Sequence, residues 1–168
     1  MSVADFWVAS ATAVIKNTSN ERLDMKFKWG RTDSDTCANS SARLPEPSGC
    51  DQVESTFINR MGLSWTDATA LLGAHTLGRG DANFSGHPGT WVRTDEESTI
   101  FDRKFYTELL SRGWIPRTFP PEDNIDNDWV WGGANLSVMM LNTDVCLCLL
   151  YTSPSPRDRQ KSRMPSSA

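Results

Sequence analysis

Apolar residues recur with helical spacing in four segments of the chain, and each segment carries a residue pattern typical of a helix boundary. These segments span 2–15, 52–61, 64–77 and 102–111. Ser2 and Ser64 each precede an aspartate by three residues, which is the spacing of an N-terminal capping box. Gly62 and Gly113 stand just past the ends of the second and fourth segments. We therefore expect four helices.

The apolar positions predict which helix faces are buried. The residues expected to face the core are Val53, Phe57, Ile58, Met61, Phe105, Leu109 and Leu110. Between the helices lie a strand-like piece at 25–29, a short apolar piece at 138–141 and loops at 33–49, 80–90 and 116–128. No internal repeat is visible and little strand is expected, so the predicted fold class is mainly α.

Composition narrows the class of protein. The chain has 168 residues, of which 38% are hydrophobic, with 7 Trp and 7 Phe, so it can bury a core. The net charge of −4 disfavours a nucleic-acid partner. The longest apolar runs are too short to span a membrane, and no secretory signal is visible at the start of the chain.

The end of the chain differs from the rest. Residues 152–168 carry four basic side chains and one acidic side chain, together with several Pro and Ser residues and no apolar periodicity. We expect residues 1–148 to form the folded portion. Residues 149–168 are expected to form a disordered basic tail, which resembles read-through of a foreign sequence and is interpreted as non-native.

One histidine stands out by its surroundings. His75 ends an apolar helix and is flanked by Gly73, Ala74 and Gly78, small residues that would let a large flat group approach the helix. The alternative is a core histidine bonded to a backbone carbonyl. Zinc is a weaker hypothesis, because the two cysteines at 146 and 148 lack the usual ligand spacing.

Residues 70–79, ALLGAHTLGR, resemble the proximal haem-ligand motif of the plant, fungal and bacterial haem peroxidase superfamily, and the likeness is strongest to its class I members, the cytochrome c and ascorbate peroxidases. Other segments resemble the same family in the same order. They are SVAD at 2–5, WGRTD at 29–33, RLP at 43–45, MGLS at 61–64, FD at 101–102 and MMLNTD at 139–144. The resemblance implies the proximal domain of a haem peroxidase, incomplete in this chain.

The family implies a role for each matching residue. His75 would ligate the iron of haem b, and Asp144 would accept the other ring N–H of His75. Trp91 would stack near His75, where an indole could be oxidised, and Arg79 could anchor a haem propionate. The alternatives are a cap or turn role for Asp144, a core role for Trp91 and a solvated charge for Arg79.

A cation is also implied beside the proximal helix. Thr76 and Asp102 match positions that often bind Ca²⁺ or K⁺ in the family, and hydroxyl and carboxylate oxygens suit such ions. Helix capping by Asp102 is the alternative. Separately, a disulfide between Cys37 and Cys50 would point to a secreted or organellar protein; two free thiols would leave localisation open.

The resemblance implies reduction of H₂O₂ with one-electron oxidation of a donor, as in a response to oxidative stress. Phe84 stands where ascorbate peroxidases carry a substrate arginine, so ascorbate is disfavoured and the donor is unidentified. The distal His and Arg of the family lie on a helix upstream of residue 2, and His87 is a poor substitute. We therefore expect this chain alone to be inactive or weak; the rival hypotheses are a non-catalytic haem-binding or scaffold remnant and a cofactor-free helical interaction module.

Overall fold

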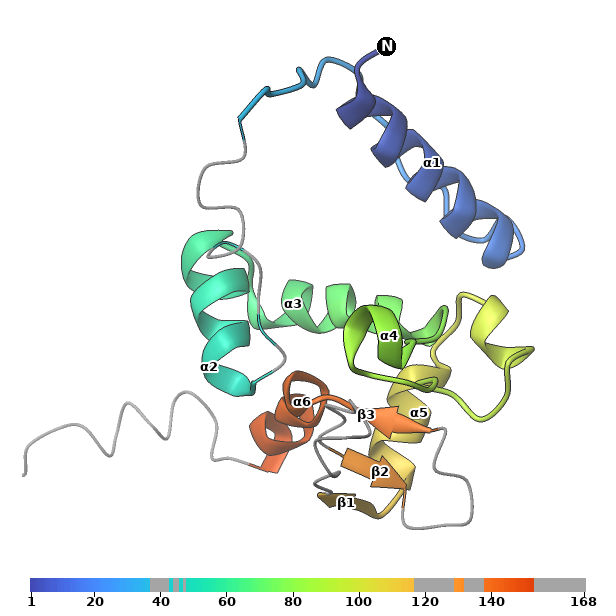
Figure 1. Cartoon of the computed structure of the whole chain (residues 1–168), viewed down its shortest axis with the longest axis vertical. Helices are drawn as coiled ribbons and strands as arrows, with labels where there is room; N and C mark the ends of the chain where they lie inside the picture. Colours follow the sequence, from blue (N-terminus) through green and yellow to red (C-terminus); the bar gives the residue numbers. More distant parts are fainter. Residues whose placement is uncertain (37–42, 44–45, 47, 117–128, 132–137, 153–168) are drawn as a thin grey trace, which may run out of the picture.

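The structure is a computed structural model that describes residues 1–36, 43, 46, 48–116, 129–131 and 138–152. Its α-helices are α1 (Val3–Thr18), α2 (Cys50–Val53), α3 (Trp65–Leu72), α4 (Ala82–Ser85), α5 (Lys104–Ser111) and α6 (Asn142–Thr152). A π-helix, η2 (Glu54–Arg60), continues α2; a 3-10 helix, η3 (Gly73–Thr76), continues α3; and η4 (Glu97–Thr99) is a further 3-10 turn. The mainly-α prediction is confirmed (Figure 1).

Three short strands form the described β structure. β1 (Trp114–Pro116), β2 (Trp129–Trp131) and β3 (Met139–Met140) make one antiparallel sheet in the order β1-β2-β3. The sheet lies beside α5 and α6 (Figure 1). Because β3 leads directly into α6, the sheet sets where that helix begins.

Helix α3 begins as its sequence predicts. The Ser64 hydroxyl accepts a hydrogen bond from the Asp67 backbone N–H at 3.1 Å, and the Asp67 carboxylate accepts one from the Ser64 backbone N–H at 3.2 Å. This is a complete capping box. Gly62, whose φ of +69° suits glycine, lies between the end of η2 and this cap.

At α1 the predicted capping box is only half formed. The Ser2 hydroxyl accepts from the Asp5 N–H, but the Asp5 carboxylate accepts from the backbone N–H groups of Gly30 and Arg31 instead of Ser2. Asp33 in turn accepts from the first N–H groups of α1. These bonds fasten residues 30–33 to the start of α1, and the strand-like piece at 25–29 carries no strand.

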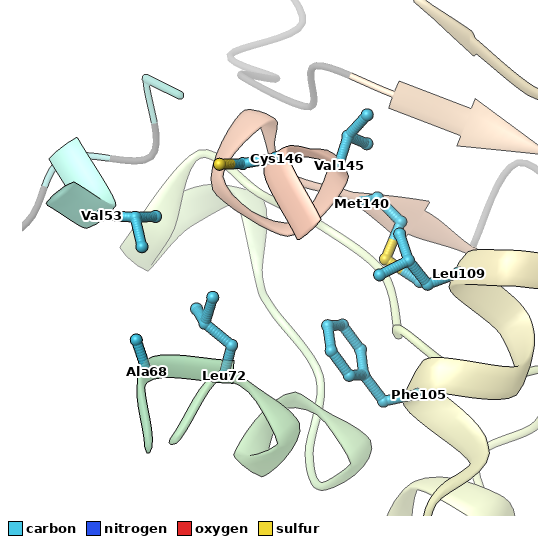
Figure 2. Packing of buried hydrophobic residues seen from close by; sticks show 8 residues of the cluster. All are labelled: Val53, Ala68, Leu72, Phe105, Leu109, Met140, Val145 and Cys146. Carbon is cyan, nitrogen blue, oxygen red and sulfur yellow. The ribbon is translucent and has the colours of Figure 1, made fainter. Parts of the chain in front are cut away.

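The buried core joins α2, α3, α5, β3 and α6 (Figure 2). Its buried members are Val53, Ala68, Leu72, Phe105, Leu109, Met140, Val145 and Cys146. Two inward predictions were wrong: Met61 is 53% exposed and Leu110 is 67% exposed. Met61 follows a π-helix, whose wider turn shifts the face expected from α-helical spacing; Leu110 lies beyond the narrow face that Phe105 and Leu109 bury.

The cysteine prediction requires a correction. Cys50 forms a disulfide with Cys146, not with Cys37, which lies outside the described residues. Cys50 begins α2 and Cys146 lies in α6, and their Cα atoms are 5.1 Å apart. Proximity in the sequence suggested the pair Cys37–Cys50. The observed pair depends instead on the packing of α2 against α6, which are far apart in the sequence. Cys148 is free.

Helix α6 extends to Thr152, past the expected boundary of the folded portion at residue 148. The remainder of the expected tail, 153–168, lies outside the described residues. None of the helices described here combines the length and apolar character needed to cross a membrane.

Candidate functional site

The site is centred on His75, which lies in η3 at the end of α3. Its Nδ1 atom is 2.8 Å from Oδ1 of Asp144, a residue 69 positions away and fully buried. With Oδ1 of Asp144 as the acceptor of this bond, Nδ1 of His75 is the donor. The lone pair of His75 is then on Nε2, the nitrogen that is free to bind a metal.

Asp144 is held in place by its own helix. It lies in the first turn of α6, and its Oδ2 atom accepts from the backbone N–H of Leu141 at 2.9 Å. The same oxygen accepts from Nε1 of Trp91 at 2.7 Å. The buried carboxylate therefore accepts three hydrogen bonds. The bond from Leu141 caps the start of α6 and the bond from His75 orients the imidazole, so the two alternative roles of Asp144 occur together.

Trp91 packs flat against the imidazole. The two ring centroids are 4.3 Å apart with an interplanar angle of 13°. The Thr90 carbonyl accepts from the Met139 N–H at 2.9 Å, which ties the segment before Trp91 to β3. Trp91 and Asp144 are thus both positioned by elements that meet at β3.

Phe105 is a site residue that the sequence identified only as core. Its ring meets the His75 ring edge-on, with centroids 5.9 Å apart. With Trp91 it confines the imidazole on two sides. The helical spacing of α5 indicated that Phe105 is buried, but nothing in the sequence distinguished contact with His75 from contact with any other core residue.

The surroundings of His75 fit a planar apolar cofactor. The His75 side chain is 29% exposed, while its Nδ1 is engaged with Asp144. Leu71 and Ala74, on the same helical stretch, are also exposed. An imidazole with a free nitrogen beside exposed apolar side chains is a donor set suited to haem, since haem iron is commonly held by one histidine.

Two of the small residues near His75 also have structural roles. A Cβ on Gly73 would collide with the Tyr106 hydroxyl, so Gly73 is required for packing of η3 against α5. Burial raises the pKa of Tyr106, and its hydroxyl donates to the Thr69 carbonyl at 2.7 Å. Gly78 has a φ of +81°, so it allows a turn.

Thr76 and Asp102, the predicted cation ligands, are brought together. The Thr76 hydroxyl donates to Oδ1 of Asp102 at 3.1 Å, and Thr76 is fully buried. The same Asp102 oxygen accepts from the Lys104 backbone N–H at 2.8 Å. Asp102 therefore also binds the first N–H of α5, whose N-cap residue is Arg103. Across the described ranges, no group of three His, Cys, Asp or Glu side chains could hold a metal ion.

Arg79 is paired on the surface. Its guanidinium lies 3.3 Å from the Asp95 carboxylate, and both side chains are more than half exposed. Such exposed pairs contribute little stability, so Arg79 can exchange partners at small cost. Phe84, on α4, is 92% exposed.

His87 is not part of the His75 cluster. It lies in the loop after α4 that a bridge between Gly80 and Gly89 closes. Its Nδ1 atom is buried and has no hydrogen-bond partner within the described part of the chain. The structure therefore joins His75, Asp144 and Trp91 in one site and leaves His87 outside it.

The chain matches known proteins over nearly all of its described length. The peroxidase family model matches residues 1–152. A candidate heme-binding peroxidase of Candida albicans is 31% identical over 148 residues, covering 86% of this chain and 47% of the relative. The mitochondrial cytochrome c peroxidase of Emericella nidulans is 29% identical, covering 88% of this chain and 38% of the relative.

A plant relative is also matched over only part of its length. The cytosolic L-ascorbate peroxidase 2 of Oryza sativa subsp. japonica is 35% identical over 112 residues, covering 66% of this chain and 42% of the relative. The chain thus spans between about two fifths and one half of the length of these relatives. Because the family match includes α3, the segment around Trp91 and the start of α6, the chain belongs to the peroxidase family, among the relatives of the class I cytochrome c and ascorbate peroxidases.

Proposed function

We propose that this chain carries the proximal haem-binding site of a haem b-dependent peroxidase that reduces H₂O₂ and oxidises a donor one electron at a time. The observation that supports this most is the 2.8 Å contact between Nδ1 of His75 and the buried Asp144 carboxylate. It commits one ring nitrogen and leaves the other for iron. The names of the matched relatives include heme binding, which agrees with this proposal.

The residues act on the cofactor by position and charge. When bound, haem supplies a redox-active iron that accepts oxidising equivalents from peroxide. His75 would ligate that iron through Nε2, and Asp144 would make the imidazole more anionic through the bond at Nδ1, which favours oxidised iron. Trp91, stacked on His75 and donating to the same carboxylate, would serve as a site of one-electron transfer.

The donor is the least specified part of the proposal. One relative is a cytochrome c peroxidase and another an ascorbate peroxidase by name. Ascorbate is an anion, whereas the exposed side chain of Phe84 offers it no charge where ascorbate peroxidases place arginine. We therefore propose a donor other than ascorbate, and a role in the response to oxidative stress through removal of peroxide.

Two ancillary sites belong to the same proposal. Arg79, whose present partner is an exposed carboxylate, would bind a haem propionate. Thr76 and Asp102 would supply oxygen ligands for Ca²⁺ or K⁺, and the cation would then replace their mutual hydrogen bond. A rise in melting temperature with added Ca²⁺ or K⁺, lost in Asp102→Asn, is the expected result.

The Cys50–Cys146 disulfide favours an oxidising compartment, because disulfides persist there and are rare in reducing ones. This keeps the secreted or organellar hypothesis, although the pair differs from the one expected. The matched relatives include proteins named as mitochondrial and as cytosolic, so relatedness alone does not select between compartments.

Haem titration of the full 168-residue chain tests the proposal. We expect a Soret band that saturates at one haem per chain in the wild type and is lost or greatly weakened in His75→Ala. His87→Ala is the matched control, since it removes the other histidine and leaves the site unchanged. Equal haem binding by all three proteins would contradict the proposal.

A non-catalytic haem-binding protein is the second candidate function. It is favoured by the position of His87, which lies in a closed loop outside the His75 cluster and so offers no second acid–base group there. The two candidates differ in whether H₂O₂ turnover depends on His75. The first predicts slow turnover by the haem-loaded chain that His75→Ala abolishes, and the second predicts no His75-dependent turnover.

A further inference from the structure

We propose that Cys50 and Cys146 are positioning residues for the His75 site. Their disulfide holds α6 in the place where Asp144 reaches both His75 and Trp91. The proposal concerns this chain's own contacts; only its consequence for haem affinity rests on the proposed function.

The geometry of α6 links the disulfide to the site. Asp144 and Cys146 are two residues apart in the first turns of the helix. At about 100° per residue they project roughly 200° apart, and so toward opposite sides of the helix. Asp144 meets His75 on one side, and Cys146 is bonded to Cys50 of α2 on the other. The helix is therefore fastened at both sides near its start.

The disulfide also lies within the core. Cys146 is fully buried and belongs to the same cluster as Val53 and Leu72, the last residue of α3 before the turn that carries His75. Figure 2 shows Cys146 on the side of α6 where Val53 lies. A shift of α6 relative to α2 would therefore move Asp144 with respect to His75.

The other attachments of α6 described here are weaker. Nε1 of Trp129 donates to the Asn142 side chain at 2.7 Å, and the Cys148 thiol makes a long 3.8 Å contact with the Leu109 carbonyl. Among the described residues, the disulfide is the one covalent link between α6 and another helix. The Asp144 contacts are hydrogen bonds that need accurate placement, because such bonds weaken steeply with misalignment.

Reduction would release this link. A dithiol reductant gives two electrons to the S–S bond and closes to a cyclic disulfide, while Cys50 and Cys146 become thiols that together gain its two protons. Cys50 is partly exposed and Cys146 is buried, so attack is expected at the Cys50 sulfur. The expected consequence is a looser Asp144, with weaker bonds to His75 and Trp91.

Hydrogen exchange of indole N–H groups tests the proposal in the full chain without haem. Nε1–H of Trp91 reports on Asp144, and Nε1–H of Trp114, which donates to the Leu109 carbonyl, is an internal reference on α5. We expect the ratio of the Trp91 rate to the Trp114 rate to rise by about tenfold on reduction, as for a local opening. The Cys50→Ala/Cys146→Ala variant should show the same rise without reductant.

Two controls separate positioning from general loosening. Cys148→Ala removes the thiol of the same helix that is outside the disulfide. Because this thiol contacts the carbonyl that also accepts from Trp114, the control is read on Trp91 alone, whose exchange rate should stay unchanged. Val53→Ala weakens the same core with the disulfide intact, so it should raise the exchange rates of the Trp91 and Trp114 indole N–H groups by the same factor. Sucrose is added to every sample to keep the reduced chain folded.

The exchange ratio decides the proposal. An unchanged ratio on reduction, equal acceleration of both indoles, or the same ratio change in Val53→Ala would each overturn it. Haem titration of the same samples should show weaker binding after reduction. A chain that binds no haem in either redox state would defeat the proposed function, whereas the exchange ratio would still decide the role of the disulfide.

Discussion

Replacing Asp144 with asparagine should weaken haem binding without unfolding the chain. The carboxylate accepts from His75 at Oδ1 and from both Trp91 and the Leu141 N–H at Oδ2. Asparagine has the same shape but only one accepting oxygen. Its amide must therefore present NH₂ either to His75 or to the two donors.

The magnitudes favour one orientation. Facing NH₂ toward Trp91 and Leu141 leaves two buried donors unpaired, at about 1–3 kcal/mol each. Facing NH₂ toward His75 costs little, because the imidazole can move its proton from Nδ1 to Nε2 and accept at Nδ1. All groups are then bonded, so the fold should survive, but the proton on Nε2 blocks iron ligation.

Iron ligation needs the His75 tautomer with its proton on Nδ1. That tautomer requires the unfavourable amide orientation, which leaves two donors unpaired and costs about 2–6 kcal/mol in total. Even the lower figure corresponds to roughly a thirtyfold loss of haem affinity. Haem titration and thermal denaturation of Asp144→Asn measure the two effects separately. Asp67→Asn is the matched control, since it alters the equivalent first-turn aspartate of α3 and touches no part of the His75 cluster.

The reasoning would be refuted by an Asp144→Asn chain that binds haem as tightly as the wild type. It would also be refuted by an Asp144→Asn chain that fails to fold, because the argument requires every buried donor to keep a partner. Loss of haem affinity in Asp67→Asn to the same extent would mean that helix capping, and not orientation of His75, is the cause.

Three further predictions concern stability. Gly73→Ala should destabilise the chain by about 1–3 kcal/mol in urea denaturation, because its Cβ collides with the Tyr106 hydroxyl. Tyr106→Phe should recover part of the loss, and no loss would mean that η3 and α5 pack differently. The hydrogen bond from the Gly30 N–H, followed by those from Arg31, lowers the pKa of Asp5. The stabilisation from the Asp5 carboxylate is therefore complete above about pH 4 and disappears as the pH falls through the lowered pKa. Asp5→Asn should lower the melting temperature at pH 7 and make the melting temperature fall less in acid, whereas parallel curves for the two proteins would contradict this. Reduction of the α2–α6 disulfide should lower the free energy of unfolding by about 2–5 kcal/mol, measured by urea titration with and without dithiol, and an unchanged midpoint would show that the link is absent in solution.

Signals between neighbouring residues predicted much of the fold. The cap at Ser64 and the helix end near Gly62 are confirmed, because both depend on residues adjacent in the chain. The half-formed cap at Ser2 shows the limit of this reasoning. Asp5 has the correct spacing, but residues 30–31 compete for its carboxylate, and that contact depends on the tertiary fold.

The site was predictable where a motif carried it. Trp91 lies 16 residues after His75, and Asp144 lies 53 residues after Trp91. Only the family resemblance linked the three residues, and the structure places them in contact. The Cys50–Cys146 pair and the contact of Phe105 with His75 could not be predicted. Both depend on how α2, α5 and α6 pack. Helical periodicity predicts that a residue is buried, but it does not predict which residue it contacts.

The most direct test of the central claim is resonance Raman spectroscopy of the haem-loaded chain in its ferrous form. The account predicts an iron–imidazole stretching band that shifts on ¹⁵N-histidine labelling, disappears in His75→Ala and persists in His87→Ala. A band that persists in His75→Ala, or no iron–imidazole band in a wild-type chain that holds haem, would contradict ligation by His75.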